Sequence, residues 1–585
     1  MFVFFEDHQE TARQFLSGLV AEHAVFFRLF CAVSRILIAF LAVAIVFRIA
    51  FSLFKGKKQP EIWGFLNLPN GLHLPVHHWE NLIGRAKNCD LVLNFPSVSR
   101  NHAALIRRDD GKWRLIDLNS KTGLYLNKTK VDKEAAAEFG DVFELGGIEA
   151  QFTSLTPAER VMQDSREVPG KEVNPALTMY LLTVFELVLA LQLCFASPER
   201  FYYSVPISFA LLAMVMWIYF IFMRLMRRRG FEVEQIAFFL SCIGLSVIAS
   251  SDPGYIFKQF LAVLIGLVIF ILLGWFLRDH KRADAMRWPM GAAAIGLLLA
   301  AIVFGSVVYG AKNWIFIGGF SVQPSELSKL CFIYAGTASL DRLFAKRNLI
   351  MYMVLTVCIA GALAYTSDFG AALIFFVAFL VVAFMRSGDV ATLSLISLAT
   401  VLGGVLLLRF KPYIAYRFES WRHVWEVPHD GGFQQTRTMS AAASGGLFGV
   451  GAGNGWLKNI VAADTDLVFG IVAEELGLIV GICCIACVII LAVFAFASSS
   501  RSRSTFYSIS ASAATAMLLF QTALNVFGSL DILPLTGVTF PFVSNGGSSL
   551  MSCFGMLAFV KATDTRRLAS FATKNIPSYN RRKGI

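Results

Sequence analysis

The chain has 585 residues, of which 56% are hydrophobic and 16% are charged, and its formal net charge is +12. A mean hydropathy of +0.62 excludes an ordinary soluble protein of this length and indicates a multi-pass membrane protein. The lysines and arginines cluster between apolar segments, which favours cytoplasmic loops over a nucleic-acid-binding surface.

The first apolar run, 36–54, ends at the basic sequence KGKK, so residues 1–58 are predicted to form an N-terminal tail and a first membrane helix. Frequent charges, alternating apolar residues and turn signals predict a soluble β domain at 60–155. A proline-containing linker at 156–177 follows, and two apolar segments within 178–230 predict a helical hairpin. These segments supply about three helices before the core.

About ten further apolar segments predict a helical core at 231–570, followed by a basic cytoplasmic tail at 571–585. If each basic cluster is cytoplasmic, alternation places the β domain inside and the loops 311–325, 411–465 and 530–545 outside. The outer segments are rich in polar residues, glycine and proline. Non-helical backbone near membrane depth needs surrounding protein or a watered cavity, so we expect the chemistry on the outer face.

Two carboxylates share one predicted helix face in the sequence VAADTDLVFGIVAEELG. Asp466, Gly470 and Glu474 recur at a spacing of four, which places the glycine between the acids. Charged side chains at membrane depth are costly and usually mark a substrate path. The alternative is that Asp466 caps the helix and the glutamates pair with cations.

A glutamate and a lysine, Glu326 and Lys329, lie three residues apart on another predicted helix. At this spacing the two side chains can form a structural ion pair. The functional alternative is a cation positioned for a phosphate group.

Five motifs occur in one order along the core. They are QPSE followed by Lys329, an S-D-x-G turn at Asp368, QQ with a GGL-x-G-x-G run, TD-x-x-F-x-x-x-x-EELG, and LP-x-TG with PF-x-S-x-GGSS. In this order they resemble the RodA/FtsW/SpoVE (SEDS) family of polytopic peptidoglycan glycosyltransferases. The resemblance implies a polytopic α-helical membrane protein with a SEDS-like core, about three extra N-terminal helices and an inserted cytoplasmic β-sandwich.

The same resemblance implies a function at the outer face of the bacterial cytoplasmic membrane. Such proteins polymerise lipid II, a disaccharide-pentapeptide on an undecaprenyl diphosphate carrier, usually with a class B penicillin-binding transpeptidase. The essential aspartate of the family corresponds to Asp466. The predicted substrate-binding residues are Glu326, Lys329, Asp368, Gln434, Gln435, Glu474, Ser548 and Ser549.

Glycosyl transfer needs a base that takes the proton of the acceptor hydroxyl and a cation that stabilises the diphosphate leaving group. Asp466 suits the first task, and Lys329 suits the second. A divalent cation, Mg²⁺ or Mn²⁺, would assist Lys329 if a carboxylate held it, and its ligands are not assigned. Glu326 and Asp368 would orient the lysine or hold that ion.

Two positions depart from the family pattern. Asp464 stands where the family often has His or Gln, and Asn545 stands where it often has Tyr. A second carboxylate beside Asp466 would raise one pKa, which favours a base, or would create a metal site. The sequence leaves both alternatives open.

The β domain carries a second set of motifs. These are IGR (83–85), SVSRNHA (97–103), DLNSKTGLYLN (117–127) and GDVFELGG (140–147). Together they resemble a forkhead-associated (FHA) domain, a β-sandwich whose loops bind phosphothreonine. The predicted phosphopeptide-binding residues are Arg85, Ser99, Arg100, Asn101, Thr122 and Asn127.

One FHA position departs from the pattern. Thr122 replaces an asparagine whose carboxamide grips the peptide backbone, so a phosphate-blind adaptor is the alternative to a phosphothreonine receptor. His102 is expected to brace its loop and not to contact ligand. The expected ligand is a threonine phosphorylated by a membrane Ser/Thr kinase, on a cell-wall partner or in this protein's own tails.

The sequence therefore predicts a lipid II polymerase for elongation, division or sporulation that is regulated or localised by phosphothreonine recognition. A flippase that moves a lipid-linked precursor across the bilayer is one alternative. A non-catalytic cell-division scaffold is another, although a scaffold has no need for Asp466.

Overall fold

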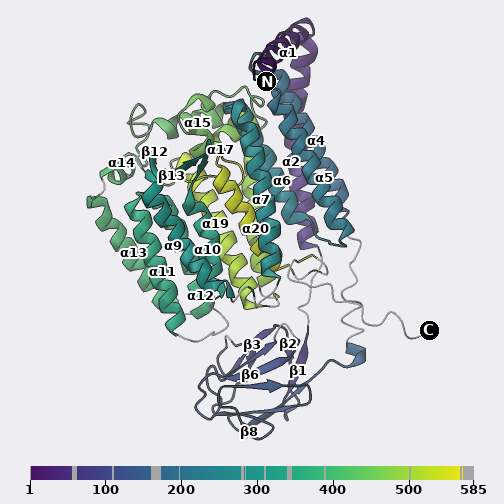
Figure 1. Ribbon diagram of the computed structural model, residues 1–585, viewed down its shortest axis with the longest axis vertical. Coiled ribbons are helices and arrows are strands. Elements are labelled where there is room, and N and C mark those ends of the chain that lie inside the picture. The colour runs from purple at the N-terminus through teal and green to yellow at the C-terminus, as the bar shows by residue number, and fades with distance from the viewer. Residues whose placement is uncertain are drawn as a thin grey trace, which may run out of the picture.

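Figure 1 shows the computed structural model, in which a bundle of long helices stands above a β domain. The structure describes residues 2–55, 62–87, 89–107, 111–159, 173–196, 198–278, 282, 285–308, 311–338, 346–387, 390–410, 412–499, 502, 504–564, 566 and 569–570. The predicted tail at 571–585 and most of the predicted linker at 156–177 lie outside these residues.

The helices fall into an N-terminal set and a core set. The N-terminal set is α1 (Phe2–Glu22), α2 (Ala24–Phe54), α4 (Pro175–Ala196) and α5 (Ser204–Leu225). The core set is α6 (Glu232–Ser251), α7 (Ile256–Leu277), α9 (Arg287–Phe304), α10 (Pro324–Ala338), α11 (Lys346–Tyr365), α12 (Phe369–Ser387), α13 (Val390–Phe410), α14 (Pro412–Ser420), α15 (Phe433–Gly445), α16 (Ala463–Asp466), α17 (Val468–Glu475), α18 (Leu478–Ser499), α19 (Thr505–Ser529) and α20 (Gly547–Ala562). Short 3₁₀ helices lie at Pro198–Arg200, Pro253–Tyr255 and Leu457–Asn459.

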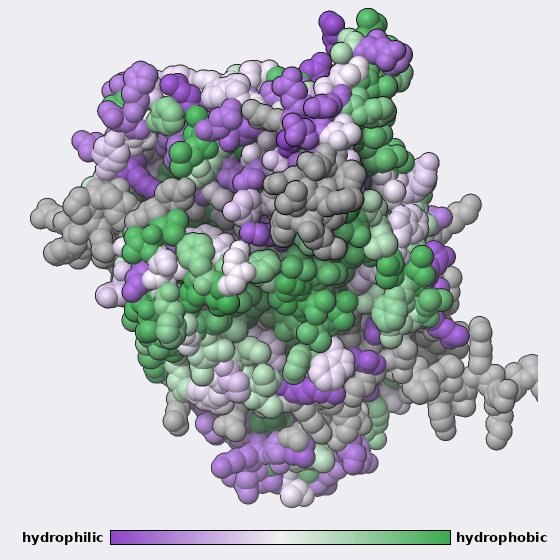
Figure 2. Space-filling model, turned by 45° about the horizontal axis from the view of Figure 1, so that its top comes forward, coloured by the Kyte–Doolittle hydropathy of each residue, from purple (hydrophilic) through white to green (hydrophobic). Residues whose placement is uncertain are grey.

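The helices confirm a multi-pass membrane protein. Within the described residues, eight helices are long and apolar enough to cross a membrane, and four shorter apolar helices accompany them. Figure 2 shows a hydrophobic belt between two more hydrophilic ends. The apolar stretch of α6 is wholly buried, so this helix lies in the centre of the bundle and packs against protein on all sides.

The β domain is a sandwich of two sheets around its own hydrophobic core. Its strands are β1 (Gly64–Asn67), β2 (His73–Val76), β3 (Glu80–Gly84), β4 (Leu91–Val92), β5 (Ala103–Arg107), β6 (Trp113–Asp117), β7 (Leu124–Leu126), β8 (Thr129–Lys130), β9 (Glu134–Ala137), β10 (Val142–Leu145) and β11 (Ile148–Thr153). One sheet has the order β2-β1-β11-β10-β7-β8, and the other has the order β4-β3-β5-β6-β9. The predicted β-sandwich is confirmed.

The β domain contacts the helical bundle at the N-terminal end of α19. Glu80 accepts hydrogen bonds from the Ser504 hydroxyl (2.9 Å) and the Thr505 backbone N–H (3.2 Å). The His78 ring lies 2.6 Å from the Ser502 carbonyl oxygen. A carboxylate at a helix N-terminus satisfies free N–H groups and complements the helix dipole, so this contact is electrostatically favourable.

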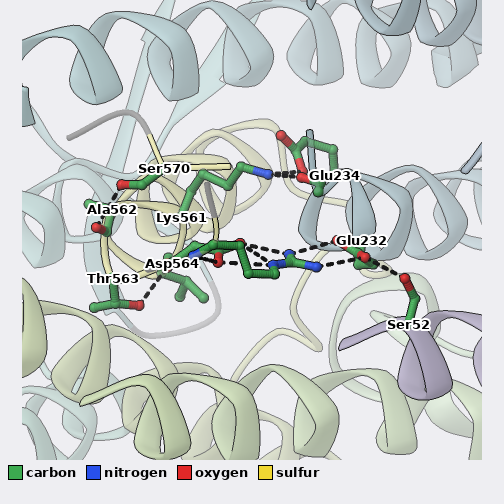
Figure 3. Close-up of polar contacts among 11 residues, drawn as sticks. Ser52, Glu232, Glu234, Lys561, Ala562, Thr563, Asp564 and Ser570 are labelled. Carbon is green, nitrogen blue, oxygen red and sulfur yellow. Dashed lines mark hydrogen bonds and ion pairs between the residues drawn. The ribbon is translucent and has the colours of Figure 1, made fainter. Parts of the chain in front are cut away.

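A polar cluster at the N-terminal end of α6 joins the N-terminal helices to the core (Figure 3). Arg566 forms ion pairs with Glu232 at the start of α6 (2.7 Å) and with Asp564 (2.6 Å). Ser52 of α2 donates to Glu232 at 2.6 Å, so α2 is held to the same cluster. Buried ion pairs are costly to break, and this cluster fixes α2 against α6.

Two local features differ from the sequence expectations. The region of the expected outer loop 311–325 contains a small antiparallel sheet of β12 (Ser306–Val308), β13 (Ala311–Ile317) and β14 (Phe320–Val322). The expected continuous helix through Asp466 and Glu474 is broken at Leu467, between α16 and α17.

Candidate active site

Asp466 is the last residue of the short helix α16, which directly precedes α17. In Figure 1, α15 and α17 lie at the end of the bundle opposite the β domain. Its backbone carbonyl accepts a hydrogen bond from Asn525 of α19 at 3.0 Å. The preceding carbonyl, of Thr465, accepts one from Ser544 at 2.7 Å. Ala462 has a left-handed φ of 58°, which turns the chain into α16. Distant polar side chains therefore hold this turn in one conformation.

The Asp466 carboxyl is partly buried and has an altered acidity. Burial raises its pKa to about 6, and the nearby charge of Asp464 adds to the rise. A hydrogen bond from Thr465 and the positive charge of Arg417 act in the opposite direction. A carboxylate with this pKa is ionised at neutral pH and is a stronger base than an ordinary aspartate.

Gly537 lies directly beside this carboxylate. A Cβ atom at position 537 would be 3.2 Å from Asp466 Oδ2, and the φ of Gly537 is 69°. Both the space and the backbone conformation favour glycine here. The absence of a side chain keeps one approach to the carboxylate open.

Glu474 and Glu475 of α17 hold the glycine-rich loop that precedes Asp466. The Glu474 carboxylate accepts backbone hydrogen bonds from Trp456 (2.9 Å) and Leu457 (3.0 Å). Glu475 accepts from Gly453 (2.9 Å) and Gly455 (3.2 Å).

This geometry corrects the predicted shared face of Asp466, Gly470 and Glu474. The helix breaks between the two acids, and a Cβ on Gly470 would be 2.4 Å from Thr438 of α15, so this glycine permits close helix packing. Glu474 is 1% exposed and both its oxygens are engaged. The contacts favour a loop anchor over a direct substrate ligand.

Glu326 and Lys329 form a buried ion pair on α10, with the lysine nitrogen 2.8 Å from Glu326 Oε1. Lys329 is 0% exposed. The second oxygen, Glu326 Oε2, is buried and has no hydrogen-bond partner among the described residues. The structural alternative from the sequence is therefore realised, and a phosphate-binding role for Lys329 stays a prediction.

Asp368 joins three elements near α12. Its Oδ1 caps α12 by accepting from the Ala371 N–H (3.1 Å), and its Oδ2 accepts from Asn313 (2.9 Å) and Gln323 (3.0 Å). The Gln323 backbone N–H in turn donates to Ser548 at 3.1 Å. Asp368 thus positions β13 and the start of α10.

The segment 533–549 connects these groups. Gly537 and Ser544 contact the Asp466 turn. Ser548 contacts Gln323, while the Ser549 hydroxyl lies 2.8 Å from the Thr539 hydroxyl. The predicted residues 548 and 549 are therefore tied to the Asp466 region through one continuous segment.

The two predicted glutamines of α15 behave differently. Gln434 donates to the Val461 carbonyl at 3.0 Å and so supports the approach to α16. Gln435 is buried, and its Oε1 has no hydrogen-bond partner among the described residues. Asn525 Oδ1 and Thr536 Oγ1 are further buried polar atoms of this kind. Buried polar atoms without a partner are uncommon in folded proteins.

In the β domain, the predicted phosphate-binding loops lie together. The Arg85 N–H donates to the Ser99 carbonyl (3.0 Å), and the Lys121 N–H donates to the Ser99 hydroxyl (3.0 Å). Arg85, Arg100 and Lys121 are all exposed. Their charges create a cationic surface that suits a phosphate group.

His102 is fully buried and braces these loops, as expected. Its Nδ1 accepts from the Ser99 N–H (3.2 Å), and its Nε2 lies 3.1 Å from the Gly123 carbonyl. Burial lowers the pKa of His102, which favours the neutral ring.

The other residues of this domain that are predicted to bind the peptide differ in their exposure and in their hydrogen bonds. Thr122 is exposed. Asn101 is partly buried and its Oδ1 lies 3.7 Å from Cys89 Sγ. Asn127 bonds to Asp141 (2.8 Å) and to the Val142 N–H (2.9 Å), so its carboxamide serves the adjoining strands.

A family model for FtsW/RodA/SpoVE, described as a cell cycle protein, matches residues 216–567, more than half of the chain. The chain belongs to this family. A model for the FHA domain matches residues 81–146. In this FtsW/RodA/SpoVE protein, α1, α2, α4 and the FHA domain all precede the matched core.

Relatives with curated names match the same core. The peptidoglycan glycosyltransferase RodA of Mycobacterium tuberculosis is 29% identical over 323 residues, which cover 52% of this chain and 69% of that protein. The probable peptidoglycan glycosyltransferase FtsW of Wigglesworthia glossinidia brevipalpis is 33% identical over 285 residues, covering 47% and 75%. Among solved structures, a chain of a peptidoglycan synthase complex is 26% identical and covers 57% of this chain and 96% of that one, with a TM-score of 0.48.

Several residues of this FtsW/RodA/SpoVE protein that shape the Asp466 site were given no role in the sequence prediction: Asn525, Ser544, Gly537 and Arg417. Gly537 and Ser544 do lie within the LP-x-TG and PF-x-S motifs. Asn525 carried a usable signal, because a carboxamide inside an apolar helix needs a polar partner. The other three give no local indication of their contacts.

Proposed function

We propose that the chain is a peptidoglycan glycosyltransferase that polymerises lipid II and uses Asp466 as its catalytic base. The supporting observation is the Asp466 turn, a partly buried carboxyl with a pKa raised to about 6, held by Asn525 and Ser544 within the family core. Curated relatives of this core are named peptidoglycan glycosyltransferases.

In the proposed reaction, Asp466 accepts the proton of the acceptor sugar hydroxyl as the hydroxyl oxygen attacks the anomeric carbon. The bond from that carbon to the diphosphate carrier breaks, and its electron pair leaves with the diphosphate. The hydrogen bonds to the turn fix the carboxylate before substrate arrives, which lowers the reorganisation needed for proton transfer.

The leaving diphosphate needs positive charge. Lys329 remains the predicted source, and in this structure it would first have to exchange Glu326 for phosphate. A divalent cation is the other source. The described residues hold no cluster of three metal-ligating side chains, but Mg²⁺ needs only one or two carboxylates when substrate phosphates and water complete its shell. Asp464, beside Asp466, is the carboxylate that would then hold the ion, which leaves Asp466 as the base.

We further propose that the Asp466 face is extracytoplasmic and the FHA domain cytoplasmic. In Figure 1, α15 and α17 lie at the end of the helical bundle opposite the FHA domain, and Figure 2 shows a hydrophobic belt between two more hydrophilic ends. The basic clusters between apolar segments favour this orientation. The proposed partner on the outer face is a class B penicillin-binding transpeptidase that crosslinks the strands. A phosphothreonine-containing protein is the proposed cytoplasmic partner.

A route for regulation supports the proposed role of the FHA domain. Arg85 follows the end of β3, and Glu80 at its beginning bonds to the N-terminal end of α19. Near the other end of α19, Asn525 holds the Asp466 carbonyl. Phosphopeptide binding that shifts β3 would therefore act on the helix that positions the base.

The test is lipid II polymerisation by the purified full-length protein, with and without a transpeptidase partner and Mg²⁺, read as glycan strands on a gel. Asp466→Asn should abolish the strands. Asp430→Asn is the matched control, since Asp430 is exposed and precedes α15. Strands that persist in Asp466→Asn would refute the base assignment. No strands under any condition, with lipid II moving across liposomes, would support a flippase, and neither activity would support a scaffold.

A further inference from the structure

A pocket of about 320 Å³ lies between the N-terminal helices and the glycine-rich loop that precedes Asp466. One wall is α2, while α4 contributes Phe195 and the loop contributes Val450 and Asn454. α1 and the adjoining end of α2 lie away from the β domain in Figure 1, toward the end of the bundle that carries α15 and α17. Because α2 and α4 precede the matched family core, this pocket is a feature of the additional helices.

The wall from α2 combines apolar side chains with two arginines. The α2 residues that line the pocket are Ala24, Phe27, Arg28, Cys31, Ala32 and Arg35, which follow helical spacing. Arg28 and Arg35 are two turns apart, about 10 Å along the helix axis. The described lining residues include no carboxylate, so the positive charge of this wall is not neutralised inside the pocket.

A network of hydrogen bonds holds Arg35 and its neighbours in place. Its Nη1 donates to the Gly449 carbonyl at 3.0 Å. Gln192 of α4, which is 1% exposed, donates to the Ser34 hydroxyl at 3.0 Å and accepts from the Ala452 N–H at 3.3 Å. These bonds fix α2, α4 and the loop relative to one another. Arg28 is exposed and free to reach a ligand at the pocket mouth.

The depth of the two arginines matches a membrane surface. The apolar end of α2 lies at Phe54, just before the basic sequence KGKK. About 20 helical residues cross the hydrocarbon core, so counting back from Phe54 places Arg35 at the opposite boundary. Arg28 then lies about 10 Å further out, at the level of lipid headgroups.

Apolar groups lie next to the charged wall. The rings of Phe27 and Phe195 are 4.7 Å apart, centroid to centroid. Ile36 and Val43 on the same helix, on the membrane side of Arg35, are 45% and 47% exposed. A ligand with an anionic head and apolar chains would satisfy both surfaces at once, because arginine binds phosphate in a bidentate manner while the chains cover the isoleucine and valine.

We propose that this pocket binds an anionic membrane phospholipid, with its phosphate on Arg28 and Arg35 and its acyl chains along α2. The site belongs to the leaflet on the Asp466 side. The bound lipid stabilises the position of the loop 449–455, because Arg35 and Gln192 contact that loop directly. The proposal does not depend on the glycosyltransferase assignment, since lipid binding is measured by itself.

The experiment compares retention of phosphatidylglycerol and phosphatidylcholine by the full-length protein, measured by native mass spectrometry from mixed micelles. Wild type should retain phosphatidylglycerol preferentially. Arg28→Gln should reduce this preference about 10-fold, because it removes charge-assisted hydrogen bonds to phosphate. Arg35→Gln should act in the same direction. Because Arg35 also bonds to Gly449, the melting temperature of this variant is measured to separate a loss of lipid binding from a loss of stability.

Arg224→Gln is the matched control, since it removes an equal charge from an exposed position near the end of α5. It should leave the preference unchanged. Equal retention of the two lipids by wild type, or an Arg28→Gln protein that retains phosphatidylglycerol like wild type, would overturn the proposal. Displacement of phosphatidylglycerol by millimolar inorganic phosphate would also overturn it, because the site would then take a soluble phosphate.

Discussion

Asn545 and Asp464 bond to each other across 81 positions of the chain. The Asn545 side-chain amide donates to Asp464 Oδ2 at 2.7 Å, and its backbone N–H donates to the Asp464 carbonyl at 2.8 Å. These are the two positions at which the sequence departs from the pattern expected of the family. Their contact explains the departures as a matched pair, in which the amide satisfies the extra carboxylate beside Asp466.

The first prediction concerns this pair. Asn545→Ala should destabilise the protein by about 1–3 kcal/mol, because it leaves a partly buried carboxylate without its donor. Polymerisation should fall, since the bond holds the segment 533–549 against the Asp466 turn.

The double mutant Asp464→Asn/Asn545→Ala separates this explanation from a general packing effect. It should recover part of the lost melting temperature, because the unpaired charge is gone. The two residues are not coupled if the double mutant loses as much melting temperature as the single mutants Asp464→Asn and Asn545→Ala lose together.

The second prediction is the pH dependence of catalysis. The pKa of Asp466 is raised to about 6, so the base is ionised above about pH 6 and protonated below it. The rate of polymerisation should therefore fall as the pH drops through about 6. A rate that stays constant down to pH 5 would contradict the assignment of Asp466 as base.

The same shift has an effect on stability. The pKa of Asp466 is about 6 in the folded state and 3.8 in the unfolded state, so the folded state binds the proton more tightly. The free energy of unfolding therefore falls as the pH rises from 3.8 to about 6. At neutral pH the ionised group costs up to about 3 kcal/mol, less for its partial exposure. Asp466→Asn should thus be inactive yet melt at a higher temperature than wild type.

The third prediction tests Glu474 as a loop anchor. Glu474→Gln places an amide group against the Trp456 or Leu457 N–H, and should destabilise the protein by about 2–4 kcal/mol. The melting temperature should fall together with activity. Glu426→Gln, an exposed change, is the control. A weaker affinity for lipid II at unchanged stability would instead support the substrate contact predicted from the sequence.

The fourth prediction concerns phosphothreonine recognition. Arg85→Ala should abolish binding of a phosphothreonine peptide to the full-length protein, because an exposed cation beside Ser99 is lost. Thr122→Asn should strengthen binding, since the carboxamide can bond to peptide backbone.

Lys133→Ala provides the control for a lost exposed charge on the same domain. Affinities are compared by isothermal titration calorimetry with the phosphorylated and unphosphorylated peptide. Equal affinity of wild type for both peptides would support the phosphate-blind adaptor.

The sequence predicted the membrane bundle and the FHA sandwich because both depend on patterns that are local or ordered along the chain, such as apolar runs and the QPSE and SRNH motifs. It did not predict the break at Leu467. No proline marks that position, and the turn is held by Asn525 and Ser544, which come from distant segments.

The helix face of Glu474 was predicted wrongly for a related reason. Helical spacing placed it on the face of Asp466, but its partners are backbone amides of the preceding loop, which no side-chain pattern reveals. The small sheet at β12–β14 was missed because a loop was expected, although Gly318 and Gly319, both with positive φ, supply the turn between β13 and β14.

The last prediction concerns the contact between the FHA domain and α19. Glu80→Gln weakens the bonds to Ser504 and Thr505 but lies at the opposite end of β3 from Arg85. Peptide affinity should therefore stay within about 2-fold of wild type, because the phosphate-binding loops are unchanged. The effect of the phosphopeptide on polymerisation should disappear, because β3 no longer holds the helix whose Asn525 positions Asp466. Glu149→Gln, on β11 of the other sheet, is the control. A phosphopeptide response that survives in Glu80→Gln would show that the signal reaches the active site without this contact.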